Sequence, residues 1–270
     1  MKIKPITLVF SAISLVVLAI YLVSPTTDSL SMGTLYLIFP IAAALVAIYT
    51  SRIHNFNNAN GRALLLITVG LVCWGIAETI TYTLNSFTDN TQYPTIANLF
   101  LLLSYPIIGV GIYQGYVAAE IKLKQVNKTL LYAVLLASLI LTVLVAYFGV
   151  YQAYDPDADV LSNIVNIGYG VGDLVLIIAS MMTILVAREY KGGKLATFWK
   201  TMALGFFLFL IADIVFAIYG ENVLADVKPY TYVDLVWEAG YQFLAFAMLE
   251  NYLHISAVQQ NIRLRLLQRK

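Results

Sequence analysis

Residues 129–151 read TLLYAVLLASLILTVLVAYFGVY and contain no charged side chain. A helix needs about 20 predominantly apolar residues to cross the hydrocarbon core of a bilayer, and this stretch is long enough. Backbone groups in lipid must be hydrogen-bonded within the protein, which favours a helix over an open strand. The stretch therefore predicts a transmembrane helix.

Similar apolar stretches recur along the whole chain, separated by short polar breaks with Gly, Pro, Asn and Asp. The predicted spans are Ile6–Ser24, Gly33–Thr50, Ala63–Leu84, Ile96–Val117, Thr129–Tyr151, Leu161–Ala187, Thr201–Tyr219 and Tyr232–Tyr252. Only 11% of the residues are charged, against about 25% in an average soluble domain. The chain is therefore predicted to be an all-α, polytopic membrane protein with eight transmembrane helices. The short breaks predict that consecutive helices form antiparallel hairpins.

The distribution of charge predicts the orientation of these helices. If the N-terminus is cytoplasmic, the inner segments hold 15 of the 16 basic residues, and only Lys228 lies outside. Cytoplasmic loops of membrane proteins carry such an excess of Lys and Arg. We therefore predict a multi-pass protein of the cell membrane with both termini in the cytoplasm. The lipid bilayer is then a predicted partner of the chain. The net charge of +1 gives no indication of nucleic-acid binding.

No linker divides the chain, so residues 1–253 are predicted to form one transmembrane domain. Residues 254–270 are too polar to span a membrane and form a predicted basic, amphipathic tail. Ile255, Val258, Ile262 and Leu266 recur in this tail at helical spacing. The tail would lie on anionic lipid through its arginines, or it would pair with a signalling partner.

Besides Glu250, which lies close to the cytoplasmic boundary, five acidic residues fall inside the predicted spans. A charge at the centre of a bilayer costs about 2.5–3.5 kcal/mol on insertion scales, so such acids are functional candidates. In the predicted orientation they lie in the outer half of the membrane or near its middle. They are Glu78, Asp173, Asp213, Asp234 and Glu238.

Helical spacing places several of these acids on faces that also carry aromatic and amide side chains. Asp234, Glu238 and Tyr241 share one face, because they are four and then three residues apart. Polar faces are costly in lipid, so we expect them to converge on an outward-facing pocket. The predicted ligand-binding residues are Glu78, Asp173, Asp213, Asp234, Glu238, Asn98, Asn166, Tyr105, Tyr169, Tyr241, Trp74 and Trp237.

No Lys or Arg lies in any predicted span, which leaves three ways to accommodate the acids. They are protonated, since burial disfavours the charged form; they hydrogen-bond to Tyr and Asn across helices; or they bind a cation. Trp74 and Trp237 beside carboxylates would suit an organic cation, and oxygen ligands alone would suit Ca²⁺ or Mg²⁺. The sequence leaves the choice between these ligands open.

The predicted spans lack the residues that several kinds of membrane protein need for their chemistry. The spans contain no lysine for a retinal Schiff base, and both histidines, His54 and His254, lie outside the spans. This argues against intramembrane haem ligation and against a HExxH zinc site. Gly170 and Gly172 precede Asp173 in a Gly-x-Gly-Asp sequence, for which we expect close helix packing. We predict no enzymatic activity and no cofactor.

Several stretches resemble the multi-pass sensor modules that precede diguanylate cyclase and histidine kinase domains in bacteria and archaea. The matching stretches are Tyr93–Pro106, Gly168–Leu176, Ala212–Asp213 and Tyr232–Tyr241, in the order found in that family. Asn98 stands where the family usually has Asp, and glycine replaces proline after Tyr169. The resemblance implies an input module whose ligand is not specified.

We therefore expect a sensory or receptor-like module that binds a cation or small ligand and signals to a separate cytoplasmic or membrane partner, or within a homo-oligomer. A transporter or channel for protons or cations is the first alternative, because intramembrane acids and repeated hairpins are found there too. An accessory subunit of a membrane complex, with polar faces used for packing alone, is the second.

Overall fold

The computed structural model describes residues 30–87, 93–121, 127–225 and 227–268, together with seven scattered positions before residue 21, and it leaves out a few side chains within those ranges. Most of the first predicted span, Ile6–Ser24, lies outside the described residues. In the described part all regular structure is helical. Its α-helices are α2 (Leu30–Ser51), α3 (Ala59–Phe87), α4 (Ile96–Ala118), α5 (Lys128–Leu144), α6 (Val160–Glu189), α7 (Lys194–Leu224) and α8 (Val233–Leu267). A π-helix, η2 (Val145–Tyr151), extends α5, and a 3-10 turn, η3 (Tyr230–Tyr232), precedes α8.

Five helices in the described residues are long and apolar enough to cross a membrane. They cover Ala59–Leu84, Ile96–Ala118, Lys128–Tyr151, Val160–Glu189 and Leu195–Leu224. In α2 the apolar stretch Leu37–Ser51 is shorter, and α8 includes Asp234, Glu238 and Glu250. The prediction of an all-α membrane-type bundle is confirmed at this level, whereas the number of eight spans and the orientation stay predictions.

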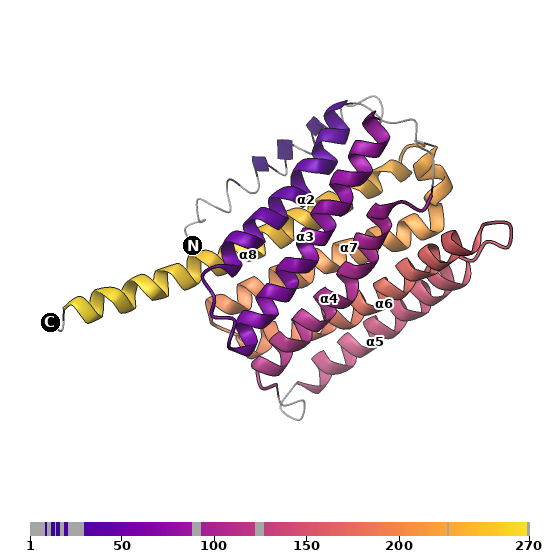
Figure 1. Ribbon diagram of the computed structural model, residues 1–270. Coiled ribbons are helices and arrows are strands. Elements are labelled where there is room, and N and C mark those ends of the chain that lie inside the picture. Colours follow the sequence, from indigo (N-terminus) through magenta and orange to yellow (C-terminus); the bar gives the residue numbers. More distant parts are fainter. Residues whose placement is uncertain are drawn as a thin grey trace.

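The helices lie side by side in one bundle (Figure 1). α3 packs along α4, α6 along α7 and α7 along α8, while α2 contacts both α3 and α8. α4 packs on α6, and α5 touches α6 only lightly. The consecutive helices α4 and α5 do not pack along each other, and the arrangement of the helices as antiparallel hairpins stays a prediction.

α5 lies at the margin of the bundle (Figure 1) and contains no buried residue. Its exposed side chains include Leu136, Leu139 and Val143. A helix with an apolar surface and no burial in protein needs another apolar environment. This supports contact of α5 with the bilayer.

Glycines allow the helices to approach each other closely at several crossings. A Cβ atom on Gly170 would overlap the backbone carbonyl of Gly149 in η2. A Cβ on Gly172 would lie 2.6 Å from the ring of Tyr105 in α4. Small residues at helix contacts let backbones pack within a membrane. The predicted packing role of Gly170 and Gly172 is therefore confirmed.

α8 is joined to α2 at the end of the bundle that we predict to be cytoplasmic. Thr50 donates a hydrogen bond to the carbonyl of Met248 (3.1 Å). The ring Nε2 of His54 lies 2.9 Å from Oδ1 of Asn251. Burial lowers the pKa of His54 below its usual value, and the hydrogen bond to Asn251 opposes this effect. Beyond this contact, α8 continues as one helix away from the bundle to Leu267 (Figure 1).

Candidate functional site

The five acids that are predicted to lie in the outer half of the membrane or near its middle come from α3, α6, α7 and α8, and the structure brings them together; we call them the acidic cluster. The charge of Glu78 interacts with Asp213 and with Asp234. Glu238 interacts with Glu78 and Asp234, and Asp173 with Asp213. Because each acid has at least one other acid within electrostatic reach, the cluster is continuous from α6 to α8. It lies near the ends of α3 and α7 and the start of α8, which we call the outer end.

Three of these acids are almost completely removed from solvent. The exposed fraction is 5% for Asp173, 9% for Asp234 and 3% for Glu238, and Glu78 and Asp213 are partly buried. Carboxyl groups are rarely this buried unless they are paired or hydrogen-bonded. The arrangement therefore differs from the open, outward-facing pocket that the sequence predicted, because the acids lie inside the bundle.

Aromatic donors hold two of the carboxyl groups in place. Nε1 of Trp237 donates to Oδ1 of Asp213 at 2.7 Å. The hydroxyl of Tyr241 donates to Oε1 of Glu78 at 3.1 Å. Both donors belong to α8 and both acceptors to neighbouring helices, so these bonds tie α8 to α7 and α3.

Asp173 and Asp213 interact through their carboxyl groups. A hydrogen bond between two carboxyl groups requires a proton on one of them. Two carboxylate oxygens of the cluster, Oδ1 of Asp173 and Oε2 of Glu238, are buried and have no hydrogen-bond partner. Such acceptors are the natural position for a proton or another cation.

An aromatic layer lies beneath the acidic cluster. It consists of Trp74, Tyr105, Phe209 and Tyr241. Tyr105 and Tyr241 both meet Trp74 edge-on, with ring centroids 6.3 and 5.9 Å away. Phe209 packs against Trp74 at 4.6 Å. Trp74 is 2% exposed, so this layer belongs to the hydrophobic core as well as to the surroundings of the acids.

A second polar group joins α4 to α6 and contains no acid. Nδ2 of Asn98 donates to the hydroxyl of Tyr169 at 2.7 Å, and the hydroxyl of Tyr93 donates to Oδ1 of Asn166 at 2.6 Å. Oδ1 of Asn98 also accepts from the backbone N–H of Thr95 at 2.6 Å, forming the capping box of α4. Burial raises the pKa of Tyr93. The side chains of Asn98 and Asn166 are therefore hydrogen-bonded within this polar group. Of its members, only Tyr169 lies close enough to interact with Glu78 and Asp213.

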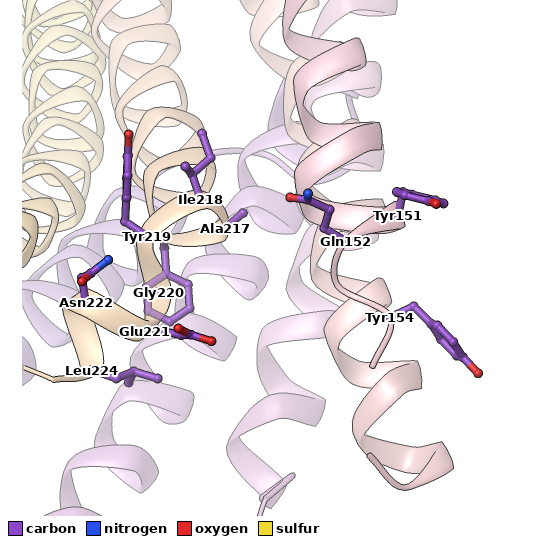
Figure 2. Close-up of a pocket in the computed structure, with 11 residues that line it drawn as sticks. Tyr151, Gln152, Tyr154, Ala217, Ile218, Tyr219, Gly220, Glu221, Asn222 and Leu224 are labelled. Carbon is purple, nitrogen blue, oxygen red and sulfur yellow. The ribbon is translucent and has the colours of Figure 1, made fainter. Parts of the chain in front are cut away.

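The bundle has a cavity of about 740 Å³ at the outer end, between η2 and the last turns of α7 (Figure 2). Tyr151, Gln152 and Tyr154 form one wall, and residues 216–222 together with Leu224 form the other. None of the predicted ligand-binding residues lines it. Phe216 connects the cavity with the acidic cluster, because it lines the cavity and its ring centroid lies 5.5 Å from that of Trp237.

The sequence did not predict the roles of Phe209 and Phe216, which pack on Trp74 and Trp237, or of Tyr93, which donates to Asn166. Phe209 and Phe216 lie four residues before and three residues after Asp213, on the same face of α7. That spacing is the signal that could have found them.

In the described part of the chain, no three His, Cys, Asp or Glu side chains are placed to hold a metal ion together. The carboxyl groups are linked in a row, from α6 through α7 and α3 to α8.

No protein-family model, curated protein or solved structure matches the chain. The resemblance to multi-pass sensor modules consequently stays a prediction from short motifs.

Proposed function

We propose that this chain is a sensory or receptor-like module of the cell membrane that takes up a proton or small cation in the acidic cluster. The observation that carries the proposal is the gathering of five acids from four helices, with buried, unpartnered oxygens on Asp173 and Glu238. Hydrogen bonds that only hold helices together do not require acidic side chains, and they would leave no buried acceptor without a donor.

α8 supports the signalling part of the proposal. The helix carries Asp234, Glu238 and Tyr241 at one end and continues without a break to Leu267 at the other. A change of charge in the cluster would shift the population of two packings of α8 against α3 and α7. Its far end would present that change to a separate partner, and the predicted eight spans with cytoplasmic termini place that end in the cytoplasm.

A proton or cation transporter is the main rival. A transported ion needs a route to both sides of the membrane. Beneath the aromatic layer, however, α3, α7 and α8 contribute Leu71, Phe206 and Leu244, none more than 1% exposed. A completely buried apolar layer supports a site with access from one side. An accessory subunit of a membrane complex is the other alternative, and a stoichiometric partner that co-purifies would favour it.

The proposal predicts that alkali cations or protons change the thermal stability of the purified full-length chain. A ligand at about 100 times its Kd stabilises the state that binds it by ~2.7 kcal/mol, which is a shift of several degrees. The melting temperature is measured in detergent with Na⁺ or K⁺ replacing N-methylglucamine at constant ionic strength, and then across pH.

The double substitution Asp173→Asn and Glu238→Gln should abolish this cation or pH dependence, because it removes the charge at the two unpartnered oxygens. Asp157→Asn is the matched control, because Asp157 is an exposed acid in the connection between η2 and α6. Equal cation and pH responses in all three proteins would refute the proposal. Ion flux in proteoliposomes that depends on Asp173 would favour the transporter.

A further inference from the structure

The cavity between η2 and α7 has the size of a small-molecule site. Its volume of about 740 Å³ falls within the range of about 300–1,000 Å³ that is typical of ligand pockets. It lies at the outer end of the bundle and is separate from the buried acidic cluster.

Both walls of this cavity depart from regular α-helix. One wall lies where the π-helix η2 ends. The other wall contains Tyr219, whose backbone is non-helical (φ −124°, ψ 18°) within α7. π-helical turns occur frequently at functional sites, and the kink at Tyr219 interrupts α7 on the facing wall. Two such departures on opposite walls of one cavity point to a binding site.

The polar groups of the cavity select the chemistry of its ligand. Figure 2 shows the side chain of Gln152 pointing from the η2 wall towards α7, and the carboxylate of Glu221 pointing into the same space from the other wall. Phe216 contributes an aromatic ring to the lining. A carboxylate and an amide oxygen accept hydrogen bonds from an ammonium group, and an aromatic face attracts it.

The cavity is connected to the acidic cluster through two aromatic side chains. The ring of Phe216 packs on Trp237 at 5.5 Å, and Nε1 of Trp237 donates to Asp213 at 2.7 Å. A ligand that repositions the last turns of α7 would therefore move the indole that holds Asp213.

We infer that this cavity binds a primary ammonium group, carried by a small amine or by the head group of an ethanolamine lipid, and is coupled through Phe216 and Trp237 to the acidic cluster. The coupling rests on the proposed function, whereas the binding does not.

Titration of the full-length chain in detergent with n-butylammonium, followed by tryptophan fluorescence and by melting temperature, tests the binding. We expect saturable binding in the wild type and no response to butan-1-ol, which lacks the charge. Glu221→Gln should weaken binding by about tenfold or more, because a hydrogen bond to a charged group contributes ~1.5–3 kcal/mol. Glu189→Gln is the control, since Glu189 is an exposed acid at the opposite end of the bundle.

Nanodiscs distinguish the two sources of the ammonium group. Weaker n-butylammonium binding in phosphatidylethanolamine than in phosphatidylcholine, which is equally zwitterionic but has no N–H to donate, identifies the lipid head group as a competitor, and equal binding identifies a free amine. Absence of saturable binding, an equal response to butan-1-ol, or unchanged binding in Glu221→Gln would overturn the inference.

The two responses of the wild type, to n-butylammonium and to alkali cations or pH, separate this inference from the proposed function. Persisting n-butylammonium binding in a wild type that shows no response to alkali cations or pH would refute the proposed function alone. A cation or pH response without n-butylammonium binding would refute the inference alone.

Discussion

Gly170→Ala lowers the stability of the bundle by about 1–3 kcal/mol, the expected cost of inserting a methyl group into a filled contact. The new Cβ would overlap the backbone carbonyl of Gly149. A backbone atom is not displaced by rotating a side chain, so α6 and η2 must move apart. Alanine is otherwise favoured over glycine in a helix by about 1 kcal/mol, so any loss has a steric origin.

Gly220→Ala provides the matched control for this prediction. A Cβ on Gly220 meets only ring carbons of Phe216, at 3.7–3.9 Å, which is ordinary contact. We expect the melting temperature of this variant to equal or exceed that of the wild type. A Gly170→Ala protein as stable as the Gly220→Ala protein would contradict the close approach of α6 to η2.

Asp213→Leu lowers stability relative to Asp213→Asn by about 1–3 kcal/mol, which is the cost of a buried donor without an acceptor. Leucine leaves Nε1 of Trp237 without its partner, whereas the amide oxygen of asparagine still accepts the hydrogen bond seen at 2.7 Å. Both variants remove the same carboxylate, but asparagine also keeps a group that can bond to Asp173, so a comparison without the indole N–H is needed to isolate the indole contact. Chemical denaturation or thermal unfolding of the two purified proteins measures their difference in stability.

The same pair of variants in a Trp237→Phe background completes the comparison. Phenylalanine has no N–H to satisfy, so the difference between leucine and asparagine at position 213 should shrink. A difference that stays undiminished in this background would show that Trp237 does not depend on Asp213.

The apolar runs were sufficient to predict most of the helices. The predicted start at Ile96 is the observed start of α4, and Leu161 lies one residue after the start of α6 at Val160. α6 extends beyond its predicted end to Glu189, and α8 continues to Leu267 through the tail whose apolar residues recur at helical spacing. Hydropathy identifies the part of a helix that faces lipid, whereas backbone hydrogen bonds continue beyond it.

The shared face of Asp234, Glu238 and Tyr241 could be predicted because helical spacing fixes it. The burial of the acids could not, because it depends on how α3, α6, α7 and α8 are placed around them. The use of Asn98 in the cap of α4 illustrates the same limit: a side chain close to a helix start can satisfy the backbone instead of a ligand. The π-helix η2 and the cavity beside it could not be predicted from the hydropathy pattern.

Infrared difference spectroscopy of the full-length chain tests the central claim that the acidic cluster exchanges a proton or small cation. Spectra are recorded while cation concentration and pH are changed, in the region of the carboxyl C=O stretch. We predict a reversible change in this band, caused by protons entering or leaving the pair formed by Asp173 and Asp213, that disappears in the variant with Asp173→Asn and Glu238→Gln and persists in Asp157→Asn. A spectrum that stays constant under all these conditions, or a change that the double substitution leaves intact, would contradict it.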